Sequence, residues 1–245
     1  MGLYVYAVGK AGEAETPSLQ GVLDRSVYRL EAASLCAIVS ECPLDNVRAE
    51  RKHIAATQRV LSAVNAKFDL LPMAFGTVAK SEEVLRSFLN DKYEALSSQM
   101  KRVSGSVEMA LRLSLDVPDP IAYLVARTPA LKAARDRTFR ARHKPSYDDK
   151  IRLGQQFDQA LTNYREALTV QVLATIGDSC SESIELPIRD EKQIANLAIL
   201  VPRTGLEAFG AAISTAAAQI DYDVVFNLSG PWPPHNFVQL NVEAT

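Results

Sequence analysis

The segment from Val107 to Leu115 alternates apolar and polar residues without interruption, and no other segment restricts the fold of this chain as strongly. Side chains along a strand point to opposite faces in turn. Period two therefore predicts a strand with one apolar and one polar face. Glu108 and Arg112 belong to the polar set, and Pro118 and Pro120 end the strand.

The elements after this strand follow a recognisable order. A long helix is predicted at 148–176, with an apolar face made of Leu153, Phe157, Leu161, Tyr164, Leu168 and Val172. Ile184–Ile188 predicts a half-buried strand, Leu197–Val201 a central strand and Val224–Leu228 a last strand. A second apolar helix is predicted at 205–220. From residue 106 the order is β, insertion, α, β, β, α, β, which predicts the ferredoxin-like split βαβ pattern.

The first hundred residues carry strands and helices of their own. Leu3–Val8 predicts a buried strand, and Leu70–Phe75 predicts a strand that its proline places at an edge or a bulge. Helices are predicted at 49–67 and after Ser81, whose hydroxyl can cap the helix. Two short strands complete the set, at Val27–Glu31 and Leu35–Ser40.

Together these elements predict an α+β chain of two domains. Residues 1–104 form an N-terminal α+β domain. Residues 105–229 form a modified ferredoxin-like split βαβ domain with an insertion at 117–148. A Pro-rich C-terminal tail covers residues 230–245.

The tail begins with Gly230-Pro231-Trp232-Pro233-Pro234, which we expect to end the preceding strand because three of its five residues lack an N–H. The prolines favour a PPII-like path, so ordering the segment costs little entropy. Trp232 is the only tryptophan, and a Trp side chain can bury about 200 Å² of surface. We therefore expect the tail to return to the N-terminal domain and to dock Trp232 or Phe237 there.

Composition narrows the class of protein. The chain of 245 residues is 47% hydrophobic and 23% charged, and its net charge of −2 indicates neither a nucleic-acid-binding nor a membrane-binding protein. Cys36, Cys42 and Cys180 are an odd number without a Cys-x-x-Cys pair, which favours a reducing compartment. No run approaches the roughly 20 apolar residues that span a bilayer. We expect a soluble cytoplasmic protein with no nucleic-acid or membrane partner.

No catalytic or metal-binding set stands out. His53, His143 and His235 lie in different predicted elements without companions at metal-ligand spacing, so we expect no metal site. Cys36 fits a small buried residue of a strand and Cys42 a loop residue, and no known signature links either to a histidine. We predict no catalytic, cofactor-binding or metal-binding residues and no cofactor.

Glycines and carboxylates give equally weak signals. Gly9 and Gly12 follow a strand, but Glu13 and Glu15 come next and no capped helix opens there. A flexible turn is therefore a better interpretation than a phosphate-binding loop. Three acidic pairs lie at element ends, where solvated acids are expected rather than acid–base catalysis. These pairs are Glu41 with Asp45, Asp148 with Asp149, and Asp221 with Asp223.

Basic residues concentrate between Arg127 and Arg152. This stretch holds nine basic and three acidic residues, a formal charge of +6 against −8 for the rest of the chain. It can meet an anionic partner, or form a solvated helical face or mobile loop, and the second interpretation is favoured. Segment 121–147 is expected to be a short helix followed by the basic stretch. It has few large apolar residues, so we expect it to bury little surface and to be mobile. Residues 195–202 contain no aromatic side chain, which argues against an RNA-recognition sheet.

Three segments resemble the gas vesicle accessory proteins of the F/L family. The opening Leu3-Tyr4-Val5-Tyr6-Ala7-Val8 resembles the first strand of that family, and Leu71-Pro72-Met73-Ala74-Phe75-Gly76-Thr77-Val78 resembles its central strand segment. The most specific segment is Phe226-Asn227-Leu228-Ser229-Gly230-Pro231-Trp232-Pro233-Pro234-His235-Asn236-Phe237. The resemblance extends over nearly the whole chain and is weakest at 117–148.

This resemblance implies a non-enzymatic accessory protein for the assembly of gas vesicles, located in the cytoplasm and at the gas vesicle. It implies binding to the main gas vesicle shell protein and to other gas vesicle accessory proteins, and it carries over no catalytic residues. The alternative from another class is a ferredoxin-like binding protein or enzyme for a small anionic metabolite, with the cluster at 127–152 as its clamp.

Overall fold

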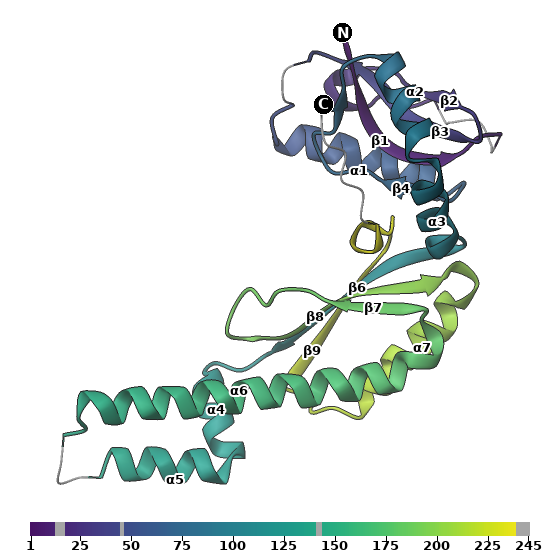
Figure 1. The fold of residues 1–245 in the computed structure, drawn as a ribbon. Coiled ribbons are helices and arrows are strands. Elements are labelled where there is room, and N and C mark those ends of the chain that lie inside the picture. Colours follow the sequence, from purple (N-terminus) through teal and green to yellow (C-terminus); the bar gives the residue numbers. More distant parts are fainter. Residues whose placement is uncertain (13–17, 45–46, 141–143, 239–245) are drawn as a thin grey trace. The chain divides into compact units, whose positions relative to one another are not determined.

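The computed structural model describes residues 1–12, 18–44, 47–140 and 144–238. The chain forms two compact units. The first contains residues 1–109, residues 200–203 and the C-terminal segment from Gly230, and the second contains residues 110–199 and 204–229. Each unit mixes helices and strands (Figure 1), so the α+β class is confirmed.

The first unit is built around strand β1 (Gly2–Lys10), in which eight of nine residues are buried. The sheet order is β2-β3-β1-β4, and β5 also pairs with β1. The pairings of β1 are antiparallel, with a register shift between Val5 and Ala7 on the β3 side. Its other strands are β2 (Val27–Ala32), β3 (Leu35–Cys42), β4 (Leu71–Pro72) and β5 (Val78–Ala79). The predicted strands at 3–8, 27–31 and 35–40 are thus confirmed.

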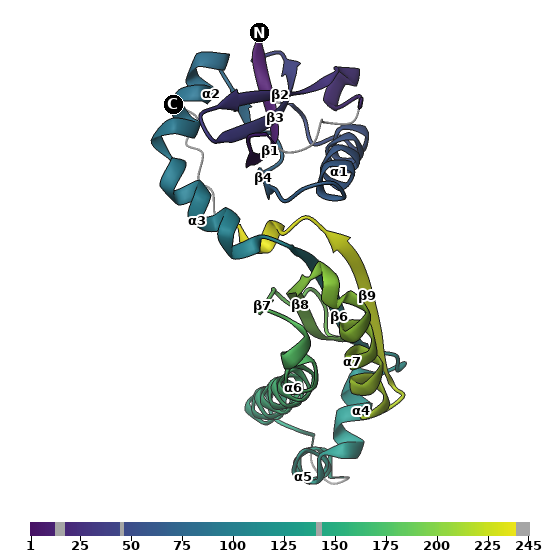
Figure 2. The same cartoon turned by 90° about the vertical axis from the view of Figure 1, so that its right-hand side faces the viewer.

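Helices cover both faces of this sheet. Helix α1 (Arg51–Asn65) lies on one face and α2 (Glu82–Asp91) on the other (Figures 1 and 2). The apolar stripe of α1 packs into a core whose buried members include Tyr4, Tyr6, Ile38, Ala56, Val60, Leu61 and Val64. Burying this stripe is what fixes the helix on the sheet, because most helical stability in proteins comes from packing of an apolar face.

Tyr4 and Tyr6 bring two hydroxyl groups into that core. A buried hydroxyl without a partner costs free energy, so each must find one. The Tyr6 hydroxyl lies 2.9 Å from the Ser40 hydroxyl and accepts from the backbone N–H of Val22 at 2.7 Å. The Tyr4 hydroxyl lies 3.1 Å from that of Thr57. The two rings therefore connect β1 to β3, to α1 and to the loop before β2.

Two expectations for residues 70–103 need correction. The predicted strand Leu70–Phe75 is reduced to β4, because residues 74–77 form a turn, and the chain pairs with β1 again only at β5. The single helix predicted after Ser81 is broken into α2 and α3 (Tyr93–Val103) at Lys92, whose backbone is not helical. Ser81 does cap α2, since its side chain accepts from the N–H of Val84.

The second sheet has the order β7-β8-β6-β9. Its central strands β6 (Ser106–Leu115) and β8 (Gln193–Pro202) are mostly buried, and β8 is buried at nine of ten positions. β7 (Glu182–Glu185) is shorter than the predicted strand at 184–188. Helix α6 (Tyr147–Ile176) connects β6 to β7 after α4 and α5, and α7 (Leu206–Ala218) connects β8 to β9. The strand predicted from the alternation at 107–115 is confirmed as β6.

Strand β9 (Val224–Trp232) corrects the expectation for the start of the tail. The strand continues through Gly230 and Pro231, joined by a cis peptide bond, to Trp232. The missing N–H of Pro231 does not end it, because an edge strand forms ladder bonds on one side only and tolerates proline.

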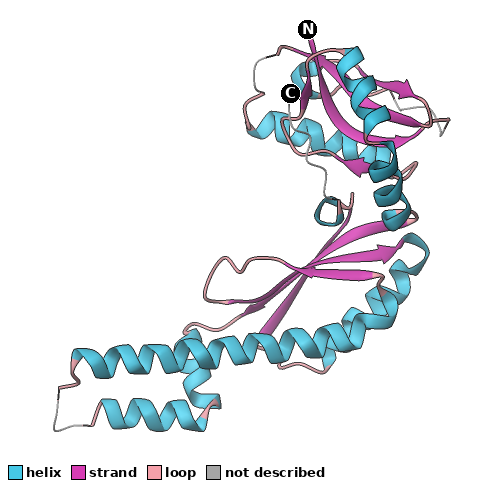
Figure 3. Cartoon of the chain, viewed as in Figure 1, coloured by secondary structure: helices cyan, strands magenta, loops and turns pink. Residues whose placement is uncertain are grey.

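The segment expected to be a short helix followed by a basic stretch contains two helices. Pro120–Arg127 forms α4 and Pro129–Thr138 forms α5, and both pack on α6 (Figure 3). They share a core of their own, made of Leu124, Val125, Leu131 and Leu161 with Tyr123, Leu153, Phe157, Ala160 and Tyr164 at its border. The expectation that residues 121–147 bury little surface was therefore wrong for 121–138. The apolar partners that make burial possible come from α6, outside the segment.

Gly21 gives a test of the tyrosine core. A Cβ atom at this position would overlap the hydroxyl and ring of Tyr6 and would approach Cγ2 of Val27 to 2.9 Å. We expect Gly21→Ala to lower the free energy of unfolding by about 1–3 kcal/mol through overpacking. The matched control is Gly154→Ala on α6, where a Cβ meets nothing within 4 Å. Helix propensity predicts a gain of about 0.5–1 kcal/mol there. Denaturant unfolding measures both, and equal effects of the two variants would contradict the expectation.

Candidate functional site

The two histidines that the structure describes, His53 and His235, lie in different elements. His53 is buried in α1 with Nδ1 3.0 Å from the carbonyl oxygen of Arg48, and His235 lies in a short 3-10 helix (η4, His235–Phe237). His143 lies outside the described residues. Among the residues that the structure describes, no group of three His, Cys, Asp or Glu side chains could hold a metal ion.

The three cysteines are free thiols. Cys36 and Cys42 are buried and Cys180 is half-buried, and burial raises the pKa of all three. A raised pKa keeps a thiol protonated, and the protonated form is a poor nucleophile. Cys36 donates to the carbonyl oxygen of Lys10 at 3.3 Å. These contacts favour a packing role.

The acidic residues of these pairs that the structure describes include a helix cap and two ion-pair partners. Asp149 completes a capping box with Ser146 at the start of α6, which lowers the pKa of Asp149. Asp221 and Asp223 pair with Arg127 at 2.9 Å and 3.4 Å. Gly12 has a positive φ of 76° in a turn after β1. Glu13, Glu15 and Asp45 lie outside the described residues.

Arg127 belongs to the basic stretch and anchors α4 through contacts that the sequence did not indicate. Besides its two carboxylate partners, its guanidinium lies 4.4 Å from the centre of the Tyr123 ring. The Tyr123 hydroxyl lies 3.3 Å from that of Tyr164 on α6. Burial and the Tyr123 contact raise the pKa of Tyr164. The remaining basic residues of α5 and α6 stand on helix surfaces.

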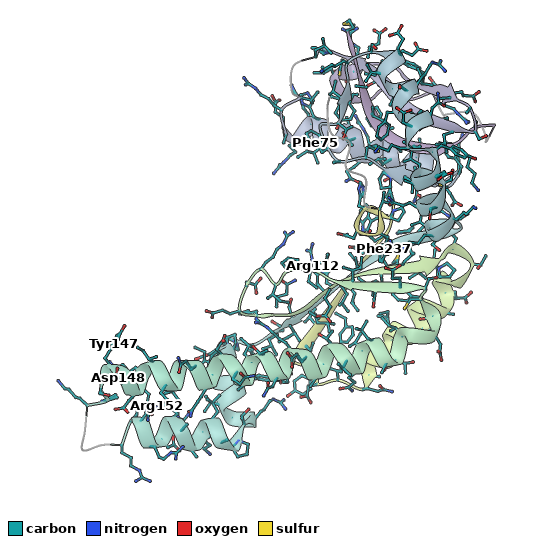
Figure 4. All side chains as sticks on the ribbon, viewed as in Figure 1. Phe75, Arg112, Tyr147, Asp148, Arg152 and Phe237 are labelled. Atoms are coloured by element: carbon teal, nitrogen blue, oxygen red, sulfur yellow. The ribbon has the colours of Figure 1, made fainter. Side chains whose placement is uncertain are left out.

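A clasp holds the C-terminal segment to the first unit. We define the tail clasp as Glu108, Arg102, Asn236 and Phe237. The two carboxylate oxygens of Glu108 accept from the backbone N–H and from Nδ2 of Asn236, at 2.8 Å and 2.6 Å. Arg102 donates to the carbonyl oxygen of Phe237 at 3.3 Å, and the Phe237 side chain is 0% exposed. Figure 4 labels Phe237 beside the short helix η4.

The clasp explains why Glu108 departs from the sequence pattern. Alternation placed it on the polar face of its strand, yet it is only 5% exposed. Burial raises the pKa of its carboxyl group, and the two bonds from Asn236 act in the opposite direction. Of the two aromatic residues expected to dock, Phe237 is buried while Trp232 remains 40% exposed.

A polar junction lies elsewhere in the same unit. Asp69 accepts from the hydroxyl of Ser104 and the N–H of Gly105, at 2.7 Å and 2.8 Å. Arg203 lies 3.8 Å from Asp69 and donates to the side chain of Asn65 at 3.0 Å. Gly105 has a φ of 68°, a conformation that favours glycine. This network fixes the turn where β6 begins.

Phe75 is presented at the surface by an anchored turn (Figure 4). The N–H of Gly76 donates to the Tyr4 hydroxyl at 3.1 Å, and Thr77 closes the turn on the carbonyl oxygen of Ala74 with its N–H and its hydroxyl. The Phe75 ring stands edge-on to Tyr4 at 6.1 Å and is 36% exposed. An aromatic side chain is thus placed at the surface by a turn that is hydrogen-bonded to the buried Tyr4.

A shallow hollow of about 530 Å³ also lies in the first unit. It is lined by Lys10, Ala11, Ser34, Leu35, Tyr93, Glu94, Ser97, Ser98, Met100 and Lys101. It contains neither a histidine nor a cysteine, and its charged groups are solvent-exposed. No helix that the structure describes is long and apolar enough to cross a membrane.

Comparison with known proteins gives this geometry its context. The family model of the gas vesicle synthesis protein GvpL/GvpF matches residues 2–239. The chain belongs to this family. It is 26% identical over 242 residues to gas vesicle protein F of Streptomyces sp. (strain CB03234), covering 98% of this chain and 100% of that protein. It is 25% identical over 258 residues to gas vesicle protein L1 of Halobacterium salinarum, covering 96% and 90%.

Solved structures support the fold. The crystal structure of the gas vesicle protein GvpF from Anabaena sp. PCC7120 matches with a TM-score of 0.86 at 23% identity, over 98% of this chain and 99% of that one. GvpF from Microcystis aeruginosa matches with a TM-score of 0.82 at 20% identity, over 98% and 99%. The resemblance inferred from the three sequence segments is therefore confirmed, and the family places this chain among gas vesicle accessory proteins.

The tail clasp predicts a loss of stability for Asn236→Ala. The substitution leaves the buried Glu108 carboxylate without the Nδ2 donor, and a lost bond to a charged group costs about 1.5–3 kcal/mol. Denaturant unfolding followed by the fluorescence of Trp232 measures the change near the clasp. Asn90→Ala, on an exposed position of α2, is the matched control and should change the free energy of unfolding by less than about 0.5 kcal/mol. Equal losses for the two variants would refute the clasp.

Glu108 also predicts a pH dependence. Its folded-state pKa is raised above the ordinary value of 4.5, so the folded protein holds this proton more tightly than the unfolded chain. The favourable contribution is complete below that value and is lost as pH rises through the folded pKa. The free energy of unfolding of the wild type minus that of Glu108→Gln should therefore fall over this window. A flat curve for Glu108→Gln contradicts the assignment.

Proposed function

We propose that this chain is a non-enzymatic assembly protein that binds the main gas vesicle shell protein and other gas vesicle accessory proteins. Membership of the GvpL/GvpF family gives its role in gas vesicle formation. The observation that carries the finer proposal is the exposed Phe75 ring on its anchored turn. We place its action in the cytoplasm and at the gas vesicle.

The hydrogen bonds that anchor the turn favour a binding role for Phe75. An exposed aromatic ring offers apolar area to a hydrophobic partner, and aromatic residues are enriched at the centres of protein interfaces. Because Tyr4 and Thr77 already fix the turn, binding there requires little further ordering of the chain. Catalysis is not needed for this role, which agrees with a protein whose described thiols are kept protonated by burial.

We also propose the domain organisation that the sequence predicts. Residues 105–229 form a modified ferredoxin-like domain with an insertion at 117–148, after an N-terminal domain at 1–104 and before the tail at 230–245. The strand order β7-β8-β6-β9 supports this assignment, because it puts the first and third strands of the pattern at the centre and the second and fourth at the edges.

Phe75→Ser tests the binding proposal. The substitution removes the exposed ring, and we expect capture of the shell protein by co-purification to fall about tenfold, as for a truncated interface anchor. Tyr93→Ser is the matched control, since Tyr93 is an exposed aromatic residue of α3 in the same unit. Both variants should fold, as checked by circular dichroism. Undiminished capture by Phe75→Ser would exclude this surface, and no capture by the wild type would reject shell binding itself.

A further inference from the structure

We propose that the surface formed by α5 and the first turns of α6 is a binding site for an acidic segment of a partner protein. We call this surface the basic tip and define it as residues 129–140 and 144–152. It is independent of the Phe75 surface, which lies in the other unit. The proposal therefore stands whether or not Phe75 meets the shell protein.

The basic tip carries an excess of unpaired positive charge. It contains seven basic and three acidic residues. Arg135 pairs with its neighbour Asp136 at 2.6 Å. The other six basic side chains have no ion pair with any residue that the structure describes, and all are exposed: Lys132, Arg137, Arg140, Lys144, Lys150 and Arg152.

The acids within the tip do not cancel this charge. Asp136 is engaged by Arg135, with bonds of 2.9 Å and 2.6 Å to one oxygen. Asp149 caps α6, where its carboxylate accepts from the N–H and the hydroxyl of Ser146 at 3.1 Å and 2.7 Å. Only Asp148 remains without such a bond among the described residues. The unpaired groups of the tip are therefore almost all cationic.

Apolar side chains stand among these cations. Phe139 is 56% exposed and Tyr147 is 79% exposed, and Ile151 is also exposed. Phe139 directly follows the last residue of α5, where its N–H donates to the carbonyl oxygen of Arg135. Tyr147, Lys150 and Ile151 are neighbours on α6 at spacings of three and four residues. Figure 4 labels Tyr147, Asp148 and Arg152 at the start of α6, with side chains directed away from the helix.

An apolar core shared by α4, α5 and α6 supports the basic tip. The core of Leu124, Val125, Leu131 and Leu161 joins α4 and α5 to α6. Arg127 fixes the base through Tyr123, Asp221 and Asp223. A mobile loop could carry charge without a fixed spacing, whereas these helices present it on a preorganised surface, which reduces the entropy lost on binding.

The mixture of charges and apolar groups identifies the class of partner. A nucleic-acid backbone or an anionic bilayer presents its phosphates continuously, so some of them would face the carboxylates of Asp136 and Asp149. The acidic side chains of a protein segment can instead be spaced so that they avoid these carboxylates. An acidic protein segment supplies carboxylates for the lysines and arginines and apolar side chains for Phe139 and Tyr147. Charge complementarity of this kind raises the rate and specificity of association.

The test uses the full-length chain and a defined probe. A fluorescein-labelled helical peptide of Glu and Leu at spacings of four residues is titrated by anisotropy, and its counterpart with Gln in place of Glu serves as the uncharged control. We expect binding of the Glu peptide only, weakened by added salt because the contacts are solvent-exposed. The triple variant Lys132→Glu/Arg137→Glu/Lys150→Glu should weaken binding at least tenfold, since it juxtaposes like charges.

Two matched comparisons make the result decisive. Lys67→Glu/Lys80→Glu/Lys101→Glu changes the net charge equally, at exposed positions of the first unit, and should bind as the wild type does. Phe139→Ser/Tyr147→Ser should weaken binding while keeping the salt dependence. Equal weakening by the two triple variants, absence of Glu-peptide binding, or tighter binding of duplex DNA or phosphatidylserine vesicles would each overturn the proposal. Circular dichroism confirms that each variant is folded.

Discussion

The first unit depends on satisfying two tyrosine hydroxyls inside an apolar core. Tyr4 and Tyr6 are fully buried on a strand that is itself covered on both faces. Each hydroxyl recruits partners from distant parts of the chain, because an unpaired buried hydroxyl would cost about 1–3 kcal/mol. One pair of residues thus sets the position of the loop at Val22, of α1 and of the turn that carries Phe75. The hydrophobic effect is non-directional, so the directional hydrogen bonds of the two hydroxyls are what specify these positions.

Regular periodicity made much of the fold predictable. The alternation at 107–115 and the apolar stripes of the long helices depend on local sequence alone, and the structure contains each element. Elements whose partners are distant were predicted only in part, since a short helix was expected within 121–147 but its packing on α6 was not. α4 and α5 contain few apolar residues, and their core is completed by Leu161 and neighbours on α6. The extent of β9 past Gly230 depends on its place at the sheet edge, which residue order does not state.

The candidate sites divide in the same way. The segment around Phe75 and the C-terminal segment were recognised through family resemblance, whereas the contacts that Phe75 and Asn236 make were not indicated by any motif. Glu108 was misplaced because alternation specifies only which face of a strand a residue occupies. Whether that face meets solvent depends on what returns to cover it, here Asn236 from the far end of the chain. A buried carboxylate bound by one amide residue has no sequence signature.

Helix α6 has a consequence for distance. With 30 residues at about 1.5 Å each it extends for about 45 Å, several times the screening length of about 8 Å at physiological salt. Its C-terminal part packs on α7, while its N-terminal part joins α5. Salt therefore largely screens the charges at the N-terminal end of α6 from the groups at its C-terminal end. A change of charge at the N-terminal end of α6 therefore leaves the electrostatic environment of the α7 contact nearly unchanged.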